Sequence, residues 1–426
     1  MGDTADRARS TPLAGVEAAR PRQPAAGRSS TALATGRAAI GWPLWCALAS
    51  SLTVALGVHW DIAWHRSIGR DSFWSPPHIA IYAAALLAAL SALAQTLPAT
   101  FGRERARRAA DDEVAGIEPA GRSANVGVLG FRGPLGGFIS AWGGVTMLAS
   151  APFDDWWHNA YGLDVKILSP PHVVLALGIV CLHLGALVML VMLVGALNRS
   201  ASPAARRSIE PLVLVVGGML LIALMTLFME KTVRVFMHAG SFYLVVGLCT
   251  PVVLVAMEGA TGRRWAGTTS AACYSLFLLA LLWTFPLVSA HPKLGPVLSP
   301  VSCLIPPEFP LLLLPAAAAL DAWMWRRRAR PGLPTVLVGG GLFLVVFLAA
   351  QWPFASFLMS PSARDYFWGA KYFDFAMPST FHYRRYLFLD ESRGDLWGGL
   401  ALALAGAVAS VAAGRGVGGW LGRVRR

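Results

Sequence analysis

Apolar runs of about 20 residues recur along the chain and alternate with short polar segments. Runs of this length match the hydrocarbon thickness of a bilayer, which a single α-helix can cross. We therefore predict an all-α fold, a polytopic membrane bundle of about ten transmembrane helices arranged as helical hairpins. The predicted spans are residues 38–58, 77–97, 124–150, 170–197, 211–229, 239–258, 266–290, 304–325, 333–352 and 397–414.

Basic residues gather in every second connecting segment of this arrangement. They occupy the amino-terminal tail and residues 103–108, 199–207, 263–264, 326–330 and 423–426. Because Lys and Arg concentrate in cytoplasmic loops, we expect both termini to be cytoplasmic in a bacterial-type plasma membrane. The remaining loops should face outward, and they are residues 59–76, 151–169, 230–238, 291–303 and 353–396.

Composition supports a membrane protein with three regions. The chain of 426 residues is 55% hydrophobic and only 14% charged. Residues 1–37 are predicted to be a disordered basic tail, residues 38–200 a duplicated four-helix metal-binding region, and residues 201–426 about six further helices with an outer loop at 353–396. The net charge of +13 comes largely from arginines in the tail and in the short loops between apolar runs, so we do not expect nucleic-acid binding. The five cysteines show no Cys-x-x-Cys spacing, which argues against a disulfide framework or a thiolate zinc site.

One motif occurs twice, in the first two predicted outer loops. The copies cover residues 59–78 and 153–172, and both end in Ser-Pro-Pro-His. Both hairpins enter from the cytoplasm, so this is a parallel internal duplication. The aligned pairs are Asp61 with Asp154, Trp64 with Trp157, His65 with His158, Gly69 with Gly162, Asp71 with Asp164, and His78 with His172.

Each copy has the residue types and spacing of a metal site. An Asp and a His four residues apart face the same way on a helix that extends beyond the preceding span. The Ser-Pro-Pro-His segment begins the next helix and places a second His in its first turn. One carboxylate and two imidazoles can hold copper, zinc or non-haem iron(II). The predicted ligands are Asp61, His65 and His78, and Asp154, His158 and His172; the predicted orienting residues are Arg70, Asp71, Asp155 and Asp164.

The first copy resembles a known family. Asp61-x-x-Trp-His65, followed by an Arg-Asp pair and by His78 thirteen residues after His65, resembles the first metal-binding segment of the C subunit of the copper membrane monooxygenases, the particulate methane and ammonia monooxygenases. The second copy is similar to that subunit's second segment, with Asp154 where the family has Asn. The resemblance covers residues 40–200. It implies two copper sites, oxidation of a small apolar substrate by dioxygen, and further partner subunits.

We therefore predict a membrane-embedded copper protein, an oxidoreductase of the monooxygenase type or a subunit of one, held in the lipid bilayer and able to form a homo-oligomer. The sequence assigns no catalytic residue, and the electrons would come from elsewhere because no haem, flavin or iron–sulfur motif is present. Two alternatives stay open. One is a non-enzymatic protein that stores, delivers or transports copper or zinc, and the other is a structural subunit whose acidic loops dock a partner. In a structural role, the motif residues would cap helices and anchor interfacial tryptophans.

Several polar residues outside the motif are weaker candidates. His59 and His183 are more typical of packing residues, although a histidine within a span is a functional candidate. A metal transporter would carry further metal ligands along the spans toward the cytoplasm. Only Cys181 and His183 offer a trace of such ligands. One outer loop carries Glu230, Lys231, Arg234 and His238, which an interfacial ion pair explains as well as a functional site does. His291 and the Pro-Pro-Glu308 run are at best a degenerate repeat of the motif. The last outer loop could cover the sites or contact a partner, although a solvated loop is the preferred interpretation; its polar residues are Asp365, Tyr366, Lys371, Asp374, His382 and Asp390.

Overall fold

The computed structural model describes residues 41–69, 72–110, 125–162, 168–199, 203–293, 301–328, 332–358, 360–363, 365, 367–368 and 391–425. These residues contain ten α-helices and one antiparallel β-hairpin. The elements are α2 (Trp42–Ser67), α3 (Pro76–Ala110), β1 (Asn125–Val128), β2 (Phe131–Pro134), α4 (Leu135–Tyr161), α5 (Pro170–Arg199), α6 (Pro203–Leu227), α7 (Gly240–Thr261), α8 (Ala266–Thr284), α9 (Leu313–Arg327), α10 (Leu333–Leu358) and α11 (Arg393–Val424). Short 3₁₀ turns are η2 (Met229–Lys231), η3 (Arg234–Phe236), η4 (Phe285–Leu287) and η5 (Pro361–Ala363).

Eight of the ten described helices are long and apolar enough to cross a bilayer, which confirms the predicted helical membrane fold. The exceptions are α4 and α9. Helix α4 has 27 residues, but small and polar residues lower its hydropathy. Helix α9 has only 15 residues, fewer than the ~20 that a span requires. The prediction of ten spanning helices is therefore confirmed for eight.

Two predicted spans begin differently in the structure. Residues 125–134 form the β-hairpin, because Leu129 and Gly130 both adopt positive φ angles and make a tight turn between the strands. Residues 304–312 are not helical, and the prolines at 306, 307 and 310 explain this, since proline disrupts the helical hydrogen-bond ladder. Helices α2, α10 and α11 also continue past their predicted ends, to Ser67, Leu358 and Val424.

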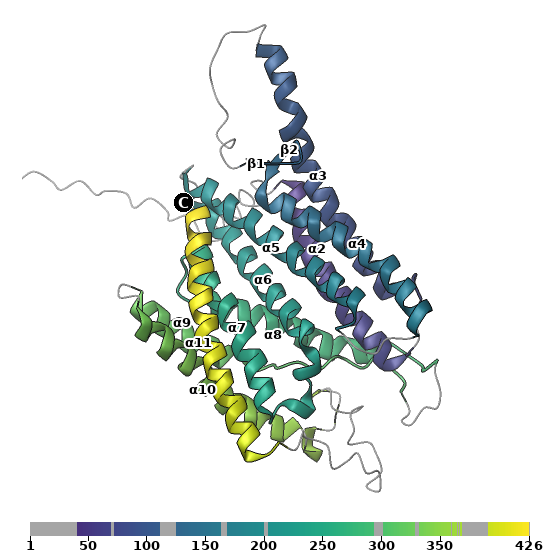
Figure 1. Cartoon of the computed structure of the whole chain (residues 1–426), viewed down its shortest axis with the longest axis vertical. Coiled ribbons are helices and arrows are strands. Elements are labelled where there is room, and N and C mark those ends of the chain that lie inside the picture. The colour runs from purple at the N-terminus through teal and green to yellow at the C-terminus, as the bar shows by residue number, and fades with distance from the viewer. Residues whose placement is uncertain are drawn as a thin grey trace, which may run out of the picture.

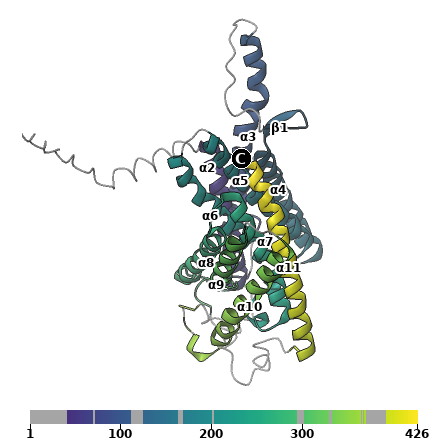
Figure 2. The same ribbon diagram turned by 90° about the vertical axis from the view of Figure 1, so that its left-hand side faces the viewer.

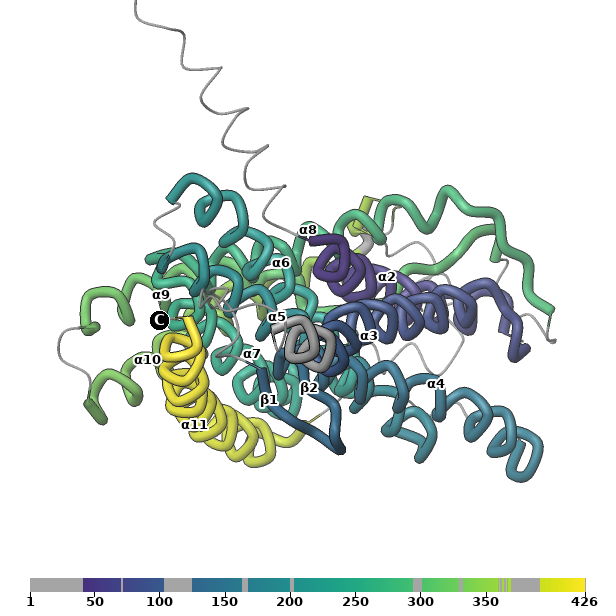
Figure 3. Tube along the Cα trace, turned by 90° about the horizontal axis from the view of Figure 1, so that it is seen from above, coloured from purple at the N-terminus to yellow at the C-terminus, as the bar shows by residue number. Residues whose placement is uncertain are grey.

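The helices form one elongated bundle (Figure 1). Viewed along the bundle, α2, α3 and α4 lie on one side, α5 lies centrally, and α9, α10 and α11 lie on the other side (Figure 3). The carboxyl end of α11 lies at the same end of the bundle as the start of α2 (Figures 1 and 2). Arg425 supports this placement, because its backbone approaches Gly195 near the end of α5 and its side chain donates to the Thr261 carbonyl at the end of α7.

Glycine allows α4 and α5 to approach closely. A Cβ atom at Gly143 would lie 2.7 Å from the carbonyl oxygen of Gly178, and a Cβ atom at Gly178 would lie 2.9 Å from the carbonyl oxygen of Gly143. Small residues at such crossings let backbones pack directly against each other inside membranes. This contact matters for function because α4 and α5 carry the second copy of the motif.

Replacing Gly143 with Leu should destabilise the protein by about 3 kcal/mol or more, because the added side chain overpacks a backbone-to-backbone contact. Thermal unfolding of the purified protein measures the effect. Gly416→Leu is the matched control, since no atom lies within 4 Å of a Cβ placed at Gly416. An equal stability for the two variants would contradict the close α4–α5 contact.

Candidate metal centres

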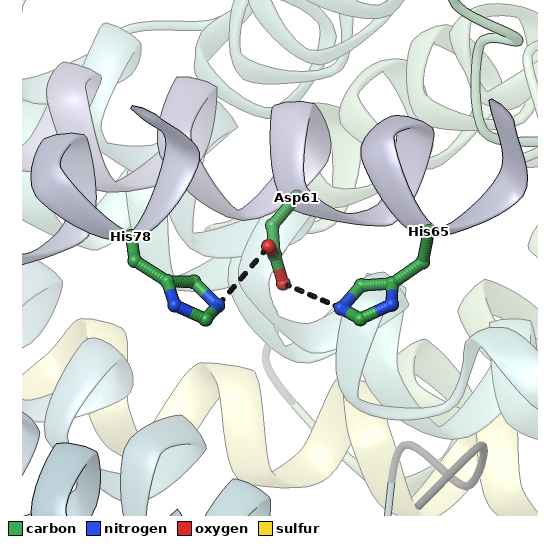
Figure 4. A group of neighbouring side chains, drawn as sticks. All are labelled: Asp61, His65 and His78. Carbon is green, nitrogen blue, oxygen red and sulfur yellow. Dashed lines mark ion pairs between the residues drawn. The ribbon is translucent and has the colours of Figure 1, made fainter. Parts of the chain in front are cut away.

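The first centre brings together Asp61, His65 and His78. Helix α2 continues to Ser67, so Asp61 and His65 lie one turn apart on the same face of its last turns. The two prolines at 76 and 77 begin α3 and place His78 in its first turn. Figure 4 shows the Asp61 carboxylate between the two imidazole rings, with one ring nitrogen of each pointing toward it. The predicted helical extension and the predicted helix start are both present.

The separations in this centre suit a single bound ion. His78 Nε2 lies 3.3 Å from Asp61 Oδ1, and His65 Nε2 lies 3.8 Å from Asp61 Oδ2. One ligand atom from each of the three residues can be chosen so that all three lie within 4.8 Å of one another. Ligands at about 2.0–2.1 Å from one ion lie roughly 3–4 Å apart. Small side-chain adjustments therefore bring the three residues into coordination range.

The second centre has the same construction. Asp154 and His158 lie one turn apart on the last turns of α4, and His172 lies in the first turn of α5. His158 Nε2 is 3.4 Å from Asp154 Oδ2, and His172 Nε2 is 3.4 Å from Asp154 Oδ1. The aspartate side chain is 21% exposed in both centres, so each carboxylate is partly shielded from solvent. The structure thus brings together both predicted ligand sets.

A single cavity of about 540 Å³ touches both centres. Of the six predicted ligands, only His158 is absent from its walls. The rest of the lining is mostly apolar and comes from five helices, α2 to α6, and from the segments that follow α2 and α6. It includes Val54, Val58, Ile81, Met147, Leu175, Ile179 and Ile222, together with the two histidines His59 and His183. Five of the six ligands therefore face one shared, largely apolar space.

The end of α2 is held in place by hydrogen bonds to residues 305–308, a segment more than 230 residues away in the sequence. Arg66 donates from Nη2 to Glu308 Oε1 at 3.0 Å and from Nη1 to the Pro306 carbonyl at 3.3 Å. The backbone N–H of Arg234 donates to Glu308 Oε2 at 2.7 Å. Ser67 Oγ accepts a hydrogen bond of 2.7 Å from the Ile305 N–H. These contacts fix the helix turn that carries His65.

Glu308 is the shared acceptor of this network, and its side chain is only 9% exposed. Burial by itself would raise the pKa of Glu308. The adjacent guanidinium groups of Arg234 and Arg66, together with their hydrogen bonds, outweigh burial and hold the pKa below its usual value. Glu308 is therefore an ionised, buried partner of two arginines.

The remaining candidates differ in their surroundings. Asp155 is exposed and accepts hydrogen bonds from Asn159 through its backbone carbonyl at 2.8 Å and its carboxylate at 3.4 Å. His238 stacks on Trp352 and donates to its carbonyl at 3.1 Å. Burial lowers the pKa of His238, although that hydrogen bond opposes the shift. The predicted orienting residues Arg70, Asp71 and Asp164, and the loop candidates Tyr366, Lys371, Asp374, His382 and Asp390, lie outside the described residues.

Asp155→Asn should leave the metal content of the purified protein unchanged within about twofold, because the carboxylate hydrogen-bonds along the exposed side of α4. Residues that orient metal ligands typically change affinity by about 10–100-fold when they are replaced. Elemental analysis of the variant beside the unmodified protein distinguishes the two outcomes. A loss of half or more of the bound metal would assign Asp155 the predicted orienting role.

No protein-family model matches this chain, and neither curated proteins nor solved structures gave a significant match.

Proposed function

We propose that this protein is an integral membrane copper protein whose two centres arose from a duplicated helical hairpin and face the outer side of the membrane. The observation that carries the proposal is the pair of similar Asp-His-His clusters, five of whose six residues line one apolar cavity. The basic segments lie in the loops at the helix ends that do not carry the two centres. This distribution supports cytoplasmic termini and centres on the outer side. The sequence resemblance to the copper monooxygenase C subunit makes copper the preferred metal over zinc or iron.

The proposed activity is oxidation of an apolar substrate by dioxygen. Copper bound in these centres would supply one-electron chemistry toward dioxygen. The chain's own residues have three tasks. Asp61 and Asp154 each hold two imidazoles in place, the three-residue ligand sets leave positions open for small molecules, and the apolar walls exclude water and admit a hydrocarbon. Electrons would come from an external reductant, and further subunits are proposed as partners.

Isotope labelling tests this function. Membranes that contain the copper-loaded protein, a reductant and a liquid alkane would be incubated under ¹⁸O₂, and the products analysed by mass spectrometry. We expect ¹⁸O in an alcohol product, and no product from the Asp61→Ala/Asp154→Ala double variant. Stoichiometric copper without oxygen incorporation would instead favour metal storage or transport. Absence of metal would favour a structural docking subunit.

A further inference from the structure

The cavity continues from the metal centres deep into the bundle. On α5 its wall is the helical stripe His172, Leu175, Ala176, Ile179 and His183. His172 and His183 lie eleven positions apart, which corresponds to about 16 Å along the helix axis. A parallel stripe on α2 runs from His65 back to Val54. The cavity therefore extends along both helices, with the metal centres near one end and His183 near the other.

The deep end carries an unusual polar group. His183 is fully buried, and its Nδ1 atom shares a hydrogen bond of 2.6 Å with Ser51 Oγ. Its Nε2 atom has no hydrogen-bond partner among the described residues. His59, which is 1% exposed and lies at intermediate depth, also has an Nε2 atom without a partner. A buried polar atom without a partner costs about 1–3 kcal/mol, so a ligand that reaches it gains a hydrogen bond where none exists.

The charges along the cavity restrict the kind of ligand. The charged lining residues are Asp61, Arg66 and Asp154, all at the metal end. No cation lines the deep end within the described residues. A carboxylate there would be buried without a counter-charge, which is strongly unfavourable. A hydroxyl group can both donate and accept, and it therefore suits either tautomer of His183.

We propose that this cavity binds an unbranched, long-chain alcohol, with its hydroxyl group at His183 and its terminal methyl group at the metal centres. An extended chain advances about 1.2 Å per bond, so about a dozen bonds cover the length of the cavity. The volume of about 540 Å³ falls among sites that enclose molecules of this size and is far larger than a one-carbon hydrocarbon needs. The inference rests on the proposed function only for the consequence that oxidation would occur at the far end of the chain.

Photolabelling with two dodecanol analogues tests the orientation. One analogue carries a diazirine beside its terminal methyl group, and the other carries it beside the hydroxyl group. In lipid nanodiscs, we expect the methyl-end probe to label residues 150–154 of α4 and 171–175 of α5. The hydroxyl-end probe should label residues 179–183 of α5. Reversed labelling, or labelling only of outward-facing residues such as Leu177, would overturn the proposal.

Competition experiments test the role of His183. In the His183→Leu variant, the dodecanol concentration needed for half-competition should rise about five- to tenfold through loss of one hydrogen bond, while the value for dodecane stays unchanged. Leu177→Ala, on the exposed side of α5, is the matched control, and Ala176→Trp should abolish labelling by filling the cavity. Equal responses to alcohol and alkane would overturn the placement of the hydroxyl group at His183. The two-probe measurement requires no variant, so a misfolded variant leaves the proposal testable.

The experiments use metal-free protein, which separates this inference from the proposed oxidation. The expected labelling in a protein that never binds copper would support the cavity ligand and reject the oxygenase. Stoichiometric copper and ¹⁸O incorporation without labelling would support the oxygenase and reject the cavity ligand.

Discussion

Replacing Asp61 with Ala is expected to remove metal from the first centre and to leave the second centre loaded. Asp61 contacts both imidazoles of its cluster, at 3.3 Å and 3.8 Å. Its loss removes a ligand and the group that orients the other two. Replacing a residue that only orients ligands costs about 10–100-fold in metal affinity, so we expect a loss of more than about 100-fold here.

Elemental analysis of the purified variant measures this effect. Metal content should fall by one ion per chain, and Asp154→Ala should produce the reciprocal loss. His238→Ala is the control, because this histidine packs on Trp352 and lies outside both clusters. Retention of both ions in the Asp61→Ala/His78→Ala double variant would exclude the first cluster as a metal site.

The second large effect is expected at Glu308. Glu308→Ala leaves the buried Arg234, which is 7% exposed, and the half-buried Arg66 without their carboxylate. Removing one partner of a buried ion pair typically costs about 3–5 kcal/mol, because the remaining buried charge loses the attraction of that partner. The free energy of unfolding should fall by about that amount, and the end of α2 that carries His65 should loosen with it. Asp155→Asn, at an exposed acid, should change the stability by less than about 0.5 kcal/mol.

The same carboxylate predicts a dependence of stability on pH. The pKa of Glu308 is lower in the folded protein than its usual value of 4.5. Its stabilising contribution is therefore complete above the pKa of the unfolded state and is lost as the pH falls through the folded-state pKa. Unfolding curves at decreasing pH, below about pH 4.5, should show a loss of stability that is smaller in Glu308→Ala. Identical pH profiles for the variant and the unmodified protein would contradict the ionised state of Glu308.

The sequence predicted the local construction of the two centres because short-range rules govern it. A spacing of four residues places Asp61 and His65 on one helix face, and Pro76 and Pro77 begin the helix that carries His78. The same rules apply to α4 and α5. Runs of apolar residues likewise revealed the spanning helices, because bilayer thickness sets their length.

Long-range features could not be predicted in this way. The pairing of Arg66 with Glu308 depends on how the helices assemble, and no local pattern connects two residues 242 positions apart. The sequence also does not reveal the cavity, although its lining at 172, 175, 176, 179 and 183 has helical spacing. The apolar run predicts helix at the β-hairpin before α4, because the valines and leucine of the hairpin prolong that run, whereas its glycines favour a turn.

The two Asp-His-His clusters are proposed to hold copper. The copper content of the protein purified from native membranes, measured together with the electron paramagnetic resonance spectrum, tests this directly. We predict about two copper ions per chain, with a spectrum of nitrogen and oxygen ligation that loses one component in His65→Ala and the other in His158→Ala. Absence of stoichiometric copper, or copper that both variants retain in full, would contradict the claim.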